Sequence, residues 1–443
     1  MNQYELHCGN SKELLKQLES NSIDSIVTDP PYELGFMGKK WDNSGIAYDV
    51  ELWAECLRVL KPGGHLLAFS GSRTYHRMTV AIEDAGFEIR DQIMWLYGSG
   101  FPKSHDVSKA IDKMAGAERE VVGSKLGLPG YSLTDGKGSM FFIGIGANGT
   151  GEGECRITAP ATDAAKEWNG WGTALKPAHE PICVARKPLI GTVAENVLMH
   201  GTGAINVDGC RVKHNEELRE KKPQKKREFS IWTTGRYENT TELKANGRWP
   251  ANIIHDGSAE VLAGFPESNS QAGKIKITKK NGGWDRNDKG MFDAGRTSEF
   301  EGYGDKGSAA RFFYCAKASK KDRDEGLEGF EERENEKIGQ LPDGFVSSYG
   351  NIRNKPQPVR NHHPTVKPTN LMQYLCRLVT PPNGLILDPF LGSGSTGKAA
   401  MYEGFRFIGF DLNQEYIDIS KARIEFALQN KKQDESKKEN TLF

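Results

Sequence analysis

Hydrophobic positions in the first hundred residues follow two different spacings. Residues 24–28 and 65–69 are short segments that each contain consecutive apolar side chains, and both resemble buried strands. Residues 49–60 and 75–85 repeat their apolar side chains every three or four positions, as amphipathic helices do, and residues 87–97 are expected to be extended. Strands that alternate with helices predict a parallel sheet.

The same alternation returns near the other end of the chain. Residues 369–379 and 395–403 have helical spacing, whereas residues 384–387 and 405–410 resemble short strands. The intervening sequence is rich in Gly, Lys and Trp and has few regular periods. We therefore expect an α/β, Rossmann-like fold in four parts. Residues 1–100 and 361–428 form the core, residues 101–360 an inserted target-recognition module, and residues 429–443 a disordered tail with little to bury.

Composition changes this picture in one respect. The chain has 443 residues, with 59 Lys and Arg against 59 Asp and Glu, so a surface that binds nucleic acid has to be built locally. Residues 211–227 and 274–289 are locally basic, which suits either phosphate contact or a solvated loop. Arg236, Arg248 and Arg311 neighbour aromatic residues, a mixture that suits base contact or packing of a small subdomain.

The cysteines indicate the compartment. All seven are widely scattered, with no Cys-x-x-Cys pair that would indicate a zinc site or a redox dithiol. No apolar run approaches the length of a membrane span. We expect a cytoplasmic protein with reduced thiols, without a bound metal and without a membrane partner.

A glycine-rich loop near the C-terminal end suggests a cofactor. Asp388 ends a predicted strand, and Gly392, Ser393 and Gly394 form a turn before the next helix, which is where ligands bind in open α/β sheets. Glycines allow close approach, the start of a helix favours a carboxylate or phosphate, and an acid suits a cation. S-adenosylmethionine carries an ammonium, a carboxylate and a sulfonium. Asp411 ends the following strand, where an acid can bind both ribose hydroxyls.

Two other interpretations of this loop stay open. Residues 392–398 match the phosphate-binding loop of nucleotide hydrolases, but Ala399 replaces the Ser or Thr that would bind Mg²⁺. Alternatively, a glycine-rich turn between a strand and a helix can lack a ligand altogether. The loop alone therefore does not decide the cofactor.

A second motif, Asp29-Pro30-Pro31-Tyr32, follows a predicted buried strand. Two prolines remove two backbone donors, so the Asp29 carboxylate and the Pro30 carbonyl are left as acceptors for the two N–H groups of a base amine. Such an amine is out of reach inside a duplex, and Tyr32 could stack on a base that has been flipped out. The alternative is a rigid surface turn with a packing tyrosine.

With both motifs present, the chain resembles the beta-type amino DNA methyltransferases, which modify adenine at N6 or cytosine at N4. Residues 363–368 are similar to the family segment that closes over the methionine end of the cofactor, and residues 171–181 resemble phage and prophage members. The cofactor residues that the resemblance implies are Asn10, Thr365, Lys367, Asp388, Pro389, Phe390, Gly392, Ser393, Gly394 and Asp411. Asn10 stands where family members often have an acid.

The resemblance implies an enzyme that transfers a methyl group from S-adenosylmethionine to N6 of adenine in double-stranded DNA by base flipping. The Asp-Pro-Pro-Tyr form favours adenine. The alternatives are an N4-cytosine DNA methyltransferase, a methyltransferase of RNA or of a protein amide, and a P-loop hydrolase. A restriction-modification system with a cognate restriction enzyme, and a homodimer, are compatible with the resemblance.

Overall fold

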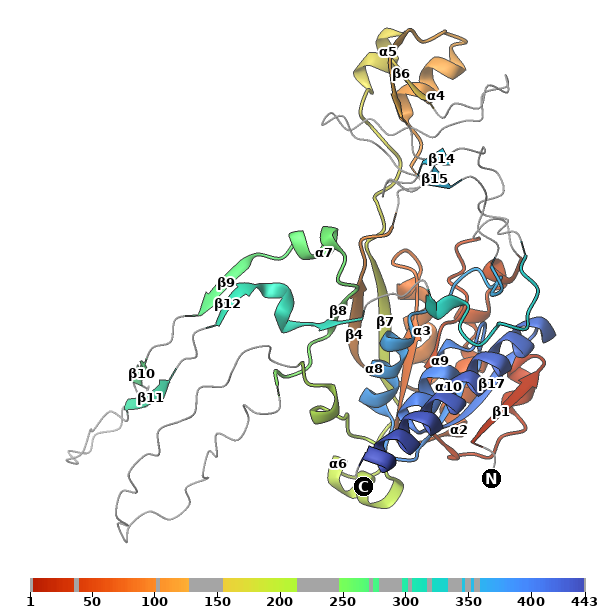
Figure 1. Ribbon diagram of the computed structural model, residues 1–443, viewed down its shortest axis with the longest axis vertical. Helices are drawn as coiled ribbons and strands as arrows, with labels where there is room; N and C mark the ends of the chain where they lie inside the picture. The colour runs from red at the N-terminus through yellow and green to blue at the C-terminus, as the bar shows by residue number, and fades with distance from the viewer. Residues whose placement is uncertain are drawn as a thin grey trace.

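The computed structural model describes residues 3–35, 40–100, 104–126, 154–212, 247–270, 274–278, 297–301, 305–316, 321–333, 345–346, 352–353 and 359–441. A nine-stranded sheet runs through this part of the chain (Figure 1). From one edge to the other its strands are β1 (Tyr4–Cys8), β17 (Arg406–Asp411), β16 (Leu385–Asp388), β2 (Ile23–Thr28), β3 (Leu60–Phe69), β7 (His179–Arg186), β4 (Glu88–Leu96), β8 (Ile253–His255) and β13 (Tyr314–Cys315). Neighbouring strands are parallel except where β7 pairs with β3 and β4. The predicted α/β class is confirmed.

Two layers of helices cover this sheet. Helices α8 (Thr369–Val379), α9 (Ser395–Glu403) and α10 (Gln414–Thr441) lie side by side on one face (Figure 1) and share a core with Val27 and Leu67. Helices α1 (Ser11–Leu15), α2 (Val50–Val59) and α3 (Tyr75–Asp84) share a second core with Ile26 and Leu66. Because successive strand residues point to opposite faces, each neighbouring pair is divided between the two cores. The two helix layers therefore cover opposite faces of the sheet.

The core is larger than the expected segments 1–100 and 361–428. Strand β7 lies in the centre of the sheet, and β8 and β13 extend its far side, although all three come from the middle of the chain. Residues 181–186 are buried without interruption. A strand buried on both faces lacks the polar alternation that would mark it in a sequence. Part of the segment 101–360, which was expected to form the target-recognition module, therefore belongs to the core.

The expected disordered tail is instead the continuation of a helix, because α10 runs on to Thr441. Ile417 and Ile424 bury the first turns of this helix. The Lys, Glu and Gln residues beyond them have high helix propensity, and extending an existing helix costs little. The loss of apolar positions at residue 429 therefore does not end the helix.

Residues 61–64 are an irregular part of β3, directly after helix α2. Gly63 has a φ of 77°, and the pairing of β3 with β2 shifts its register between Ile23 and Ser25. A Cβ at Gly63 would lie 2.5 Å from Nδ2 of Asn196, so this position needs a glycine for space as well as for conformation.

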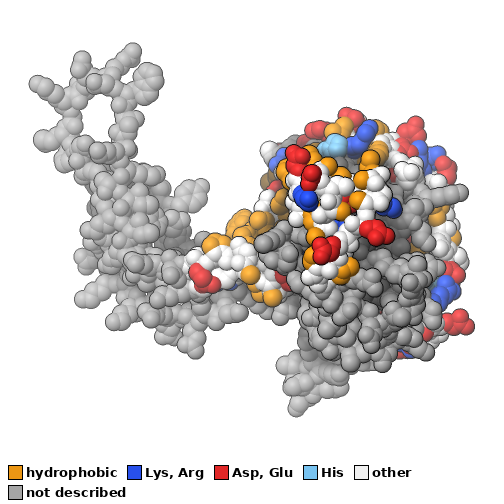
Figure 2. Space-filling view, turned by 90° about the horizontal axis from the view of Figure 1, so that it is seen from above, with side chains coloured by type: hydrophobic (Ala, Val, Ile, Leu, Met, Phe, Trp, Pro, Cys, Tyr) orange, Lys and Arg blue, Asp and Glu red, His pale blue; other side chains and the backbone are white. Residues whose placement is uncertain are grey.

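A small unit projects beyond the sheet at the top of Figure 1, formed by α4 (Val107–Met114), α5 (Asp163–Glu167) and the hairpin of β5 (Val121–Leu126) with β6 (Glu154–Thr158). Asp112 holds it together by accepting hydrogen bonds from Arg119 at 2.8 Å and from the backbone of Ala161 and Thr162 at 3.0 Å. Figure 2 looks onto this end, where acidic, basic and hydrophobic side chains are mixed over the described residues.

The remaining elements are short. They are α6 (Val193–His200), α7 (Ala259–Ala263), and the two-stranded pairs β9 (Glu267–Ser270) with β12 (Asp305–Ser308), β10 (Lys274–Thr278) with β11 (Thr297–Glu301), and β14 (Phe345–Val346) with β15 (Ile352–Arg353). Among the described residues, no helix has the length and apolar character needed to span a membrane.

Candidate active site

A cavity of about 1520 Å³ lies at the carboxyl ends of the parallel strands β2, β16 and β17. Most of the predicted site residues line it, namely Asn10, Asp29, Pro30, Pro31, Tyr32, Thr365, Lys367, Asp388, Pro389, Phe390, Gly392, Ser393 and Asp411. Residues 173–180, which lead into β7, line it from the middle of the chain. The fold therefore brings both predicted motifs to one cavity.

Gly394 is the predicted residue that is not part of this lining. It has a φ of 73°, and a Cβ there would lie 2.8 Å from the Cβ of Ser420 on α10. Gly392, with a φ of 53°, does line the cavity, and a Cβ there would lie 2.9 Å from Nε2 of His363. Both glycines are thus required by backbone conformation and by close neighbours.

Lys367 lies at the centre of a polar cluster on the cavity wall. Its Nζ is 2.8 Å from Asp29 Oδ2, 3.1 Å from the Tyr32 hydroxyl and 3.3 Å from Glu180 Oε2. The Tyr32 hydroxyl donates a hydrogen bond of 2.9 Å to the same Glu180 oxygen. We call Asp29, Tyr32, Glu180 and Lys367 the Lys367 cluster. Lys367, which was expected to bind the cofactor, is therefore paired with Asp29, the acid of the catalytic motif.

The protonation states in the Lys367 cluster follow from its charges. Burial opposes the charged form of Lys367, but Asp29 and Glu180 outweigh it and raise the pKa of Lys367 above its usual value. Burial and the same two carboxylates raise the pKa of Tyr32 well above 10, so the phenol is neutral. Asp29 keeps a second oxygen, Oδ1, which is buried and has no hydrogen-bond partner. A buried acceptor without a donor is costly, which makes this atom ready to accept one.

The acids of the cofactor motif sit at the ends of neighbouring strands. Asp388 Oδ1 accepts a hydrogen bond of 2.6 Å from Thr28 and one of 3.1 Å from the backbone of Phe390. Burial raises the pKa of Asp388 to about 6, against the opposing effect of the bond from Thr28. Asp411 accepts from the backbone N–H of Gly392 at 2.9 Å, so it fastens the glycine loop to the end of β17. Burial also raises the pKa of Asp411.

Asn10 and Thr365 line the cavity but are held by their own chain. Asn10 Oδ1 caps α1 by accepting from Lys12 N at 2.9 Å, which leaves only its Nδ2 group for a ligand. The carbonyl of Thr365 is 2.5 Å from His363 Nδ1. Burial lowers the pKa of His363 to about 4, so this imidazole is neutral near pH 7.

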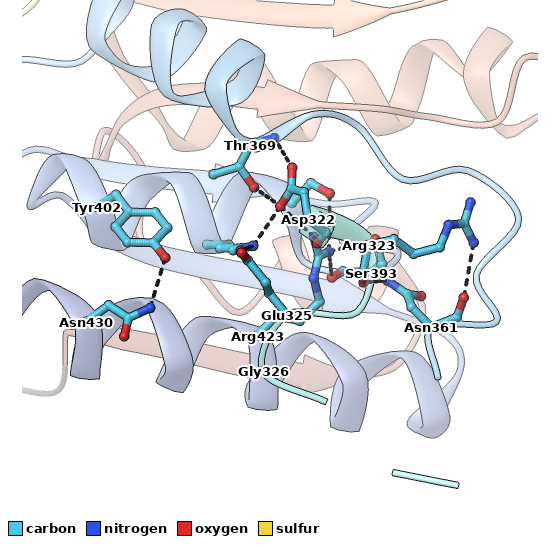
Figure 3. Close-up of polar contacts among 12 residues, drawn as sticks. Asp322, Arg323, Glu325, Gly326, Asn361, Thr369, Ser393, Tyr402, Arg423 and Asn430 are labelled. Carbon is cyan, nitrogen blue, oxygen red and sulfur yellow. Dashed lines mark hydrogen bonds and ion pairs between the residues drawn. The ribbon is translucent and has the colours of Figure 1, made fainter. Parts of the chain in front are cut away.

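The phosphate-binding interpretation of the glycine loop fails at Lys398. Its side chain is fully buried, and its Nζ is 2.6 Å from Asp322 Oδ1 and 3.0 Å from Glu325 Oε2. Figure 3 shows Asp322 and Glu325 close to Arg423, and neither acid is among the residues that line the cavity. A lysine committed to two carboxylates cannot bind a nucleotide phosphate, so the loop is not a P-loop.

The predicted basic segments 211–227 and 274–289 lie mostly outside the described residues, as does Arg236. Arg248 and Arg311 both contact the Phe312 ring, with their guanidinium carbons 5.1 and 4.4 Å from its centre. These two arginines therefore support packing of a subdomain and not base contact.

The geometry of the cavity agrees with a comparison of the whole sequence. A model of the N6/N4 DNA methylase family matches residues 23–422, a span that contains both motifs. The chain belongs to this DNA methylase family. The resemblance to the amino DNA methyltransferases is thereby confirmed, and S-adenosylmethionine is the cofactor of this methylase.

Individual relatives match the methylase over shorter stretches. The type II methyltransferase M.HpaI of Haemophilus parainfluenzae is 38% identical over 113 residues, which are 24% of this chain and 36% of that protein. The type II methyltransferase M2.DpnII of Streptococcus pneumoniae is 41% identical over 76 residues, which are 17% of this chain and 28% of that protein. The methylase thus spans about a third of the length of these curated relatives.

Solved structures similar to the methylase include the cytosine-N4-specific PvuII DNA methyltransferase, with a TM-score of 0.40 and 14% identity over 96% of this chain and 86% of that one. The complex of M1.HpyAVI with SAM has a TM-score of 0.35 and 13% identity over 95% and 99% of the two chains.

The cavity of the methylase suits S-adenosylmethionine in its charges and its shape. Asp388 and Asp411 line it at neighbouring strand ends, where they would hold a cation and ribose hydroxyls. Gly392 lacks the Cβ that would collide with the His363 ring beside the cavity. When bound, this cofactor supplies an electrophilic methyl group on a sulfonium.

Two site residues were not predicted from the sequence. Glu180 begins β7, whose place in the sheet was not foreseen, and no local pattern marked it as an acid of the site. Thr28 ends β2 one position before Asp29, and its bond to Asp388 links the catalytic strand to the cofactor strand. The available sequence signal for Thr28 was its position at the end of a predicted strand, directly before Asp29.

Proposed function

We propose that this methylase transfers a methyl group to the N6 amine of adenine in double-stranded DNA after flipping the base into the cavity. The observation that carries the proposal is the Asp29 carboxylate, whose Oδ2 is held by Lys367 while its Oδ1 is buried without a donor. An exocyclic amine of a base supplies such a donor. The Asp-Pro-Pro-Tyr sequence is the form that favours adenine over cytosine in the family that the chain resembles.

Hydrogen bonds from the amine to Asp29 and to the Pro30 carbonyl would draw its lone pair out of conjugation with the ring. The nitrogen can then form a bond to the methyl carbon as the bond from that carbon to sulfur breaks. It carries a positive charge until it loses one of its two protons to water. A carboxylate next to the nitrogen stabilises that charge, and such preorganised electrostatics is a major source of catalysis.

Tyr32 offers the surface on which a flipped base can stack. Its ring lines the cavity, and its hydroxyl is fixed by Glu180 and Lys367. Fixing the hydroxyl holds the ring beside Asp29, so stacking would orient the base amine towards the carboxylate. Stacking on an aromatic ring recovers part of the cost of taking the base out of the duplex.

The proposal is tested by incubating the methylase with tritiated S-adenosylmethionine and unmethylated genomic DNA. Digestion to nucleosides and mass analysis then identify the labelled base. We expect labelled N6-methyladenine. Labelled N4-methylcytosine would transfer the assignment to cytosine with the same residues, since both bases present an amine. Label in RNA or protein alone would refute DNA as the substrate.

The rim of the cavity suggests how the duplex is opened. Leu175 lines the mouth of the cavity with 92% of its surface exposed, and its loop is fixed because Ser104 Oγ accepts from the backbone of Thr173 at 2.8 Å and of Ala174 at 3.2 Å. An apolar side chain on a fixed loop can fill the space that a flipped base leaves.

We therefore expect Leu175→Ala to slow methylation of a duplex by about tenfold, since unstacking costs a few kcal/mol, with a much smaller effect on a single-stranded oligonucleotide of the same sequence. Single-turnover rates on the two substrates measure the difference. Equal slowing on both would show that Leu175 does not act on the duplex.

The raised pKa of Asp388 makes cofactor affinity depend on pH. The free protein holds a proton on Asp388 up to a pH of about 6. Its folded-state pKa is raised, so the stability of the free protein falls as the pH rises from about 4 to about 6. A bound cation favours the ionised carboxylate. Calorimetry between pH 5 and pH 7 should therefore show affinity for S-adenosylmethionine rising by up to about tenfold per pH unit below 6, then levelling off.

The control for this pH dependence is Asp388→Asn, which cannot ionise. We expect it to bind the cofactor more weakly and with a flatter pH profile over the same range. A rise of equal size in Asp388→Asn would assign the titration to another group, such as Asp411, whose pKa burial also raises.

A further inference from the structure

Glu180 is an acid of the cavity that neither sequence motif contains. It lies at the start of β7, where it is paired in register with Trp95 of β4. Its side chain is 20% exposed, as is that of Asp29, while that of Lys367 is 8% exposed. One largely buried ammonium is therefore shared between two carboxylates. Only one of these carboxylates belongs to the catalytic motif.

The charges in the Lys367 cluster explain why a second acid is needed. If Lys367 faced Asp29 alone, its ammonium would cancel the carboxylate that the proposed reaction uses. With Glu180 present, the two carboxylates outnumber the single cation, so the cluster keeps a net negative charge beside the target amine. That charge favours a nitrogen that becomes positive during methyl transfer. Interactions between charges a few ångströms apart in a partly buried site are strong enough to alter a rate.

The geometry gives Glu180 a second effect on the same step. Its Oε2 accepts from the Tyr32 hydroxyl at 2.9 Å and is 3.3 Å from Lys367 Nζ. The Lys367 ammonium also lies 5.3 Å from the centre of the Tyr32 ring, so Glu180 fixes the cation and the aromatic ring in one arrangement. The base-stacking surface and the amine acceptor are thereby held relative to each other.

We propose that Glu180 is a positioning residue for methyl transfer, which acts through Lys367 and Tyr32 to leave the cluster with a net negative charge and the Asp29 carboxylate available to the target amine. This inference rests on the proposed function, because it needs an amine at Asp29. Glu180 does not contact the cofactor motif through any hydrogen bond described for it, so its effect belongs to the transfer step and not to cofactor binding.

The experiment compares Glu180→Gln, Lys367→Met and the double variant with the wild type in single-turnover methylation of DNA, with cofactor affinity measured on the same preparations. Glutamine keeps an acceptor for Tyr32 but removes the charge, so we expect Glu180→Gln to slow transfer on the order of 10- to 100-fold with unchanged cofactor affinity. Removing Lys367 as well frees Asp29 from its neutralising partner. The double variant should therefore transfer faster than Glu180→Gln alone.

The matched control is Glu88→Gln, which makes the same chemical change in an ion pair with Arg186 at the other end of β7, away from the cavity lining. We expect it to transfer at the wild-type rate. A wild type that labels DNA, combined with a double variant slower than Glu180→Gln, would overturn the positioning role alone. So would a loss of cofactor affinity in Glu180→Gln as large as its loss of rate. A wild type that leaves DNA unlabelled would instead remove the proposed function, and this inference with it.

Discussion

Asp29→Ala should abolish methyl transfer while leaving cofactor binding close to that of the wild type. The substitution removes the acceptor assigned to the target amine, and losing such preorganised electrostatics together with amine orientation should lower the single-turnover rate on the order of 10³-fold or more. Lys367 retains Glu180 as a counter-ion, so no buried cation is left alone. Cofactor affinity by calorimetry and transfer by label incorporation measure the two properties separately.

Asp29→Asn is the companion variant for this experiment. The amide keeps one oxygen that can accept from an amine but carries no charge, so we expect a smaller loss than in Asp29→Ala. Loss of cofactor affinity in parallel with loss of transfer would contradict the division between Asp29 and the cofactor residues Asp388 and Asp411.

Asp322→Ala should destabilise the whole protein more than other substitutions near the site. Asp322 accepts from the backbone N–H of Thr369 at 2.6 Å and from Lys398 at 2.6 Å, and lies 3.6 Å from Arg423. Lys398 and Arg423 are both fully buried (Figure 3 labels Asp322 and Arg423). Removing their shared carboxylate leaves Lys398 with Glu325 alone and takes away the carboxylate next to Arg423, and breaking a buried ion pair typically costs about 3–5 kcal/mol. Urea denaturation of the two proteins measures the free energy of unfolding.

Glu325→Gln is the control for the effect of Asp322. Its carboxylate also contacts Lys398, at 3.0 Å, but its side chain is 31% exposed, so solvent replaces part of what is lost. We expect a change well below that of Asp322→Ala. Equal destabilisation by both variants would show that the loss of either charge partner of Lys398 has the same effect, and that the hydrogen bonds that Asp322 accepts from Thr369 add nothing.

The sequence predicted best the elements whose apolar side chains repeat at a regular spacing along the chain. Residues 369–379 were expected to be a helix, and α8 has these bounds, because its apolar side chains repeat at helical spacing on one buried face. Asp29 and Asp388 were each predicted to lie at the end of a strand, one in the catalytic motif and one in the cofactor motif, and both line one cavity. Local spacing and the rule for strand ends are sufficient for this much.

Other features depend on partners that are remote in sequence. By its place in the sequence, Lys398 resembles the lysine of a P-loop. In the structure it is paired with Asp322 and Glu325, and neither acid lies in a recognisable motif. Glu180 enters the site only because β7 is placed between β3 and β4. Lys367 was expected at the cofactor, but the structure pairs it with Asp29. In each case a charged side chain takes its role from an ion pair that sequence spacing does not encode.

The order of strands in the sheet has a consequence for biosynthesis. β2 lies between β3 and β16, and β1 pairs with β17. The strands synthesised first can therefore complete their pairing only after the last strands have been synthesised. A ribosome that has not yet released residue 385 has exposed Asp29 and Glu180 but neither Asp388 nor Asp411. The nascent chain therefore contains the proposed amine acceptor long before it contains the cofactor acids. Contacts so distant along the chain form late, and the enzyme would acquire its methyl donor only once its final strand has joined the sheet.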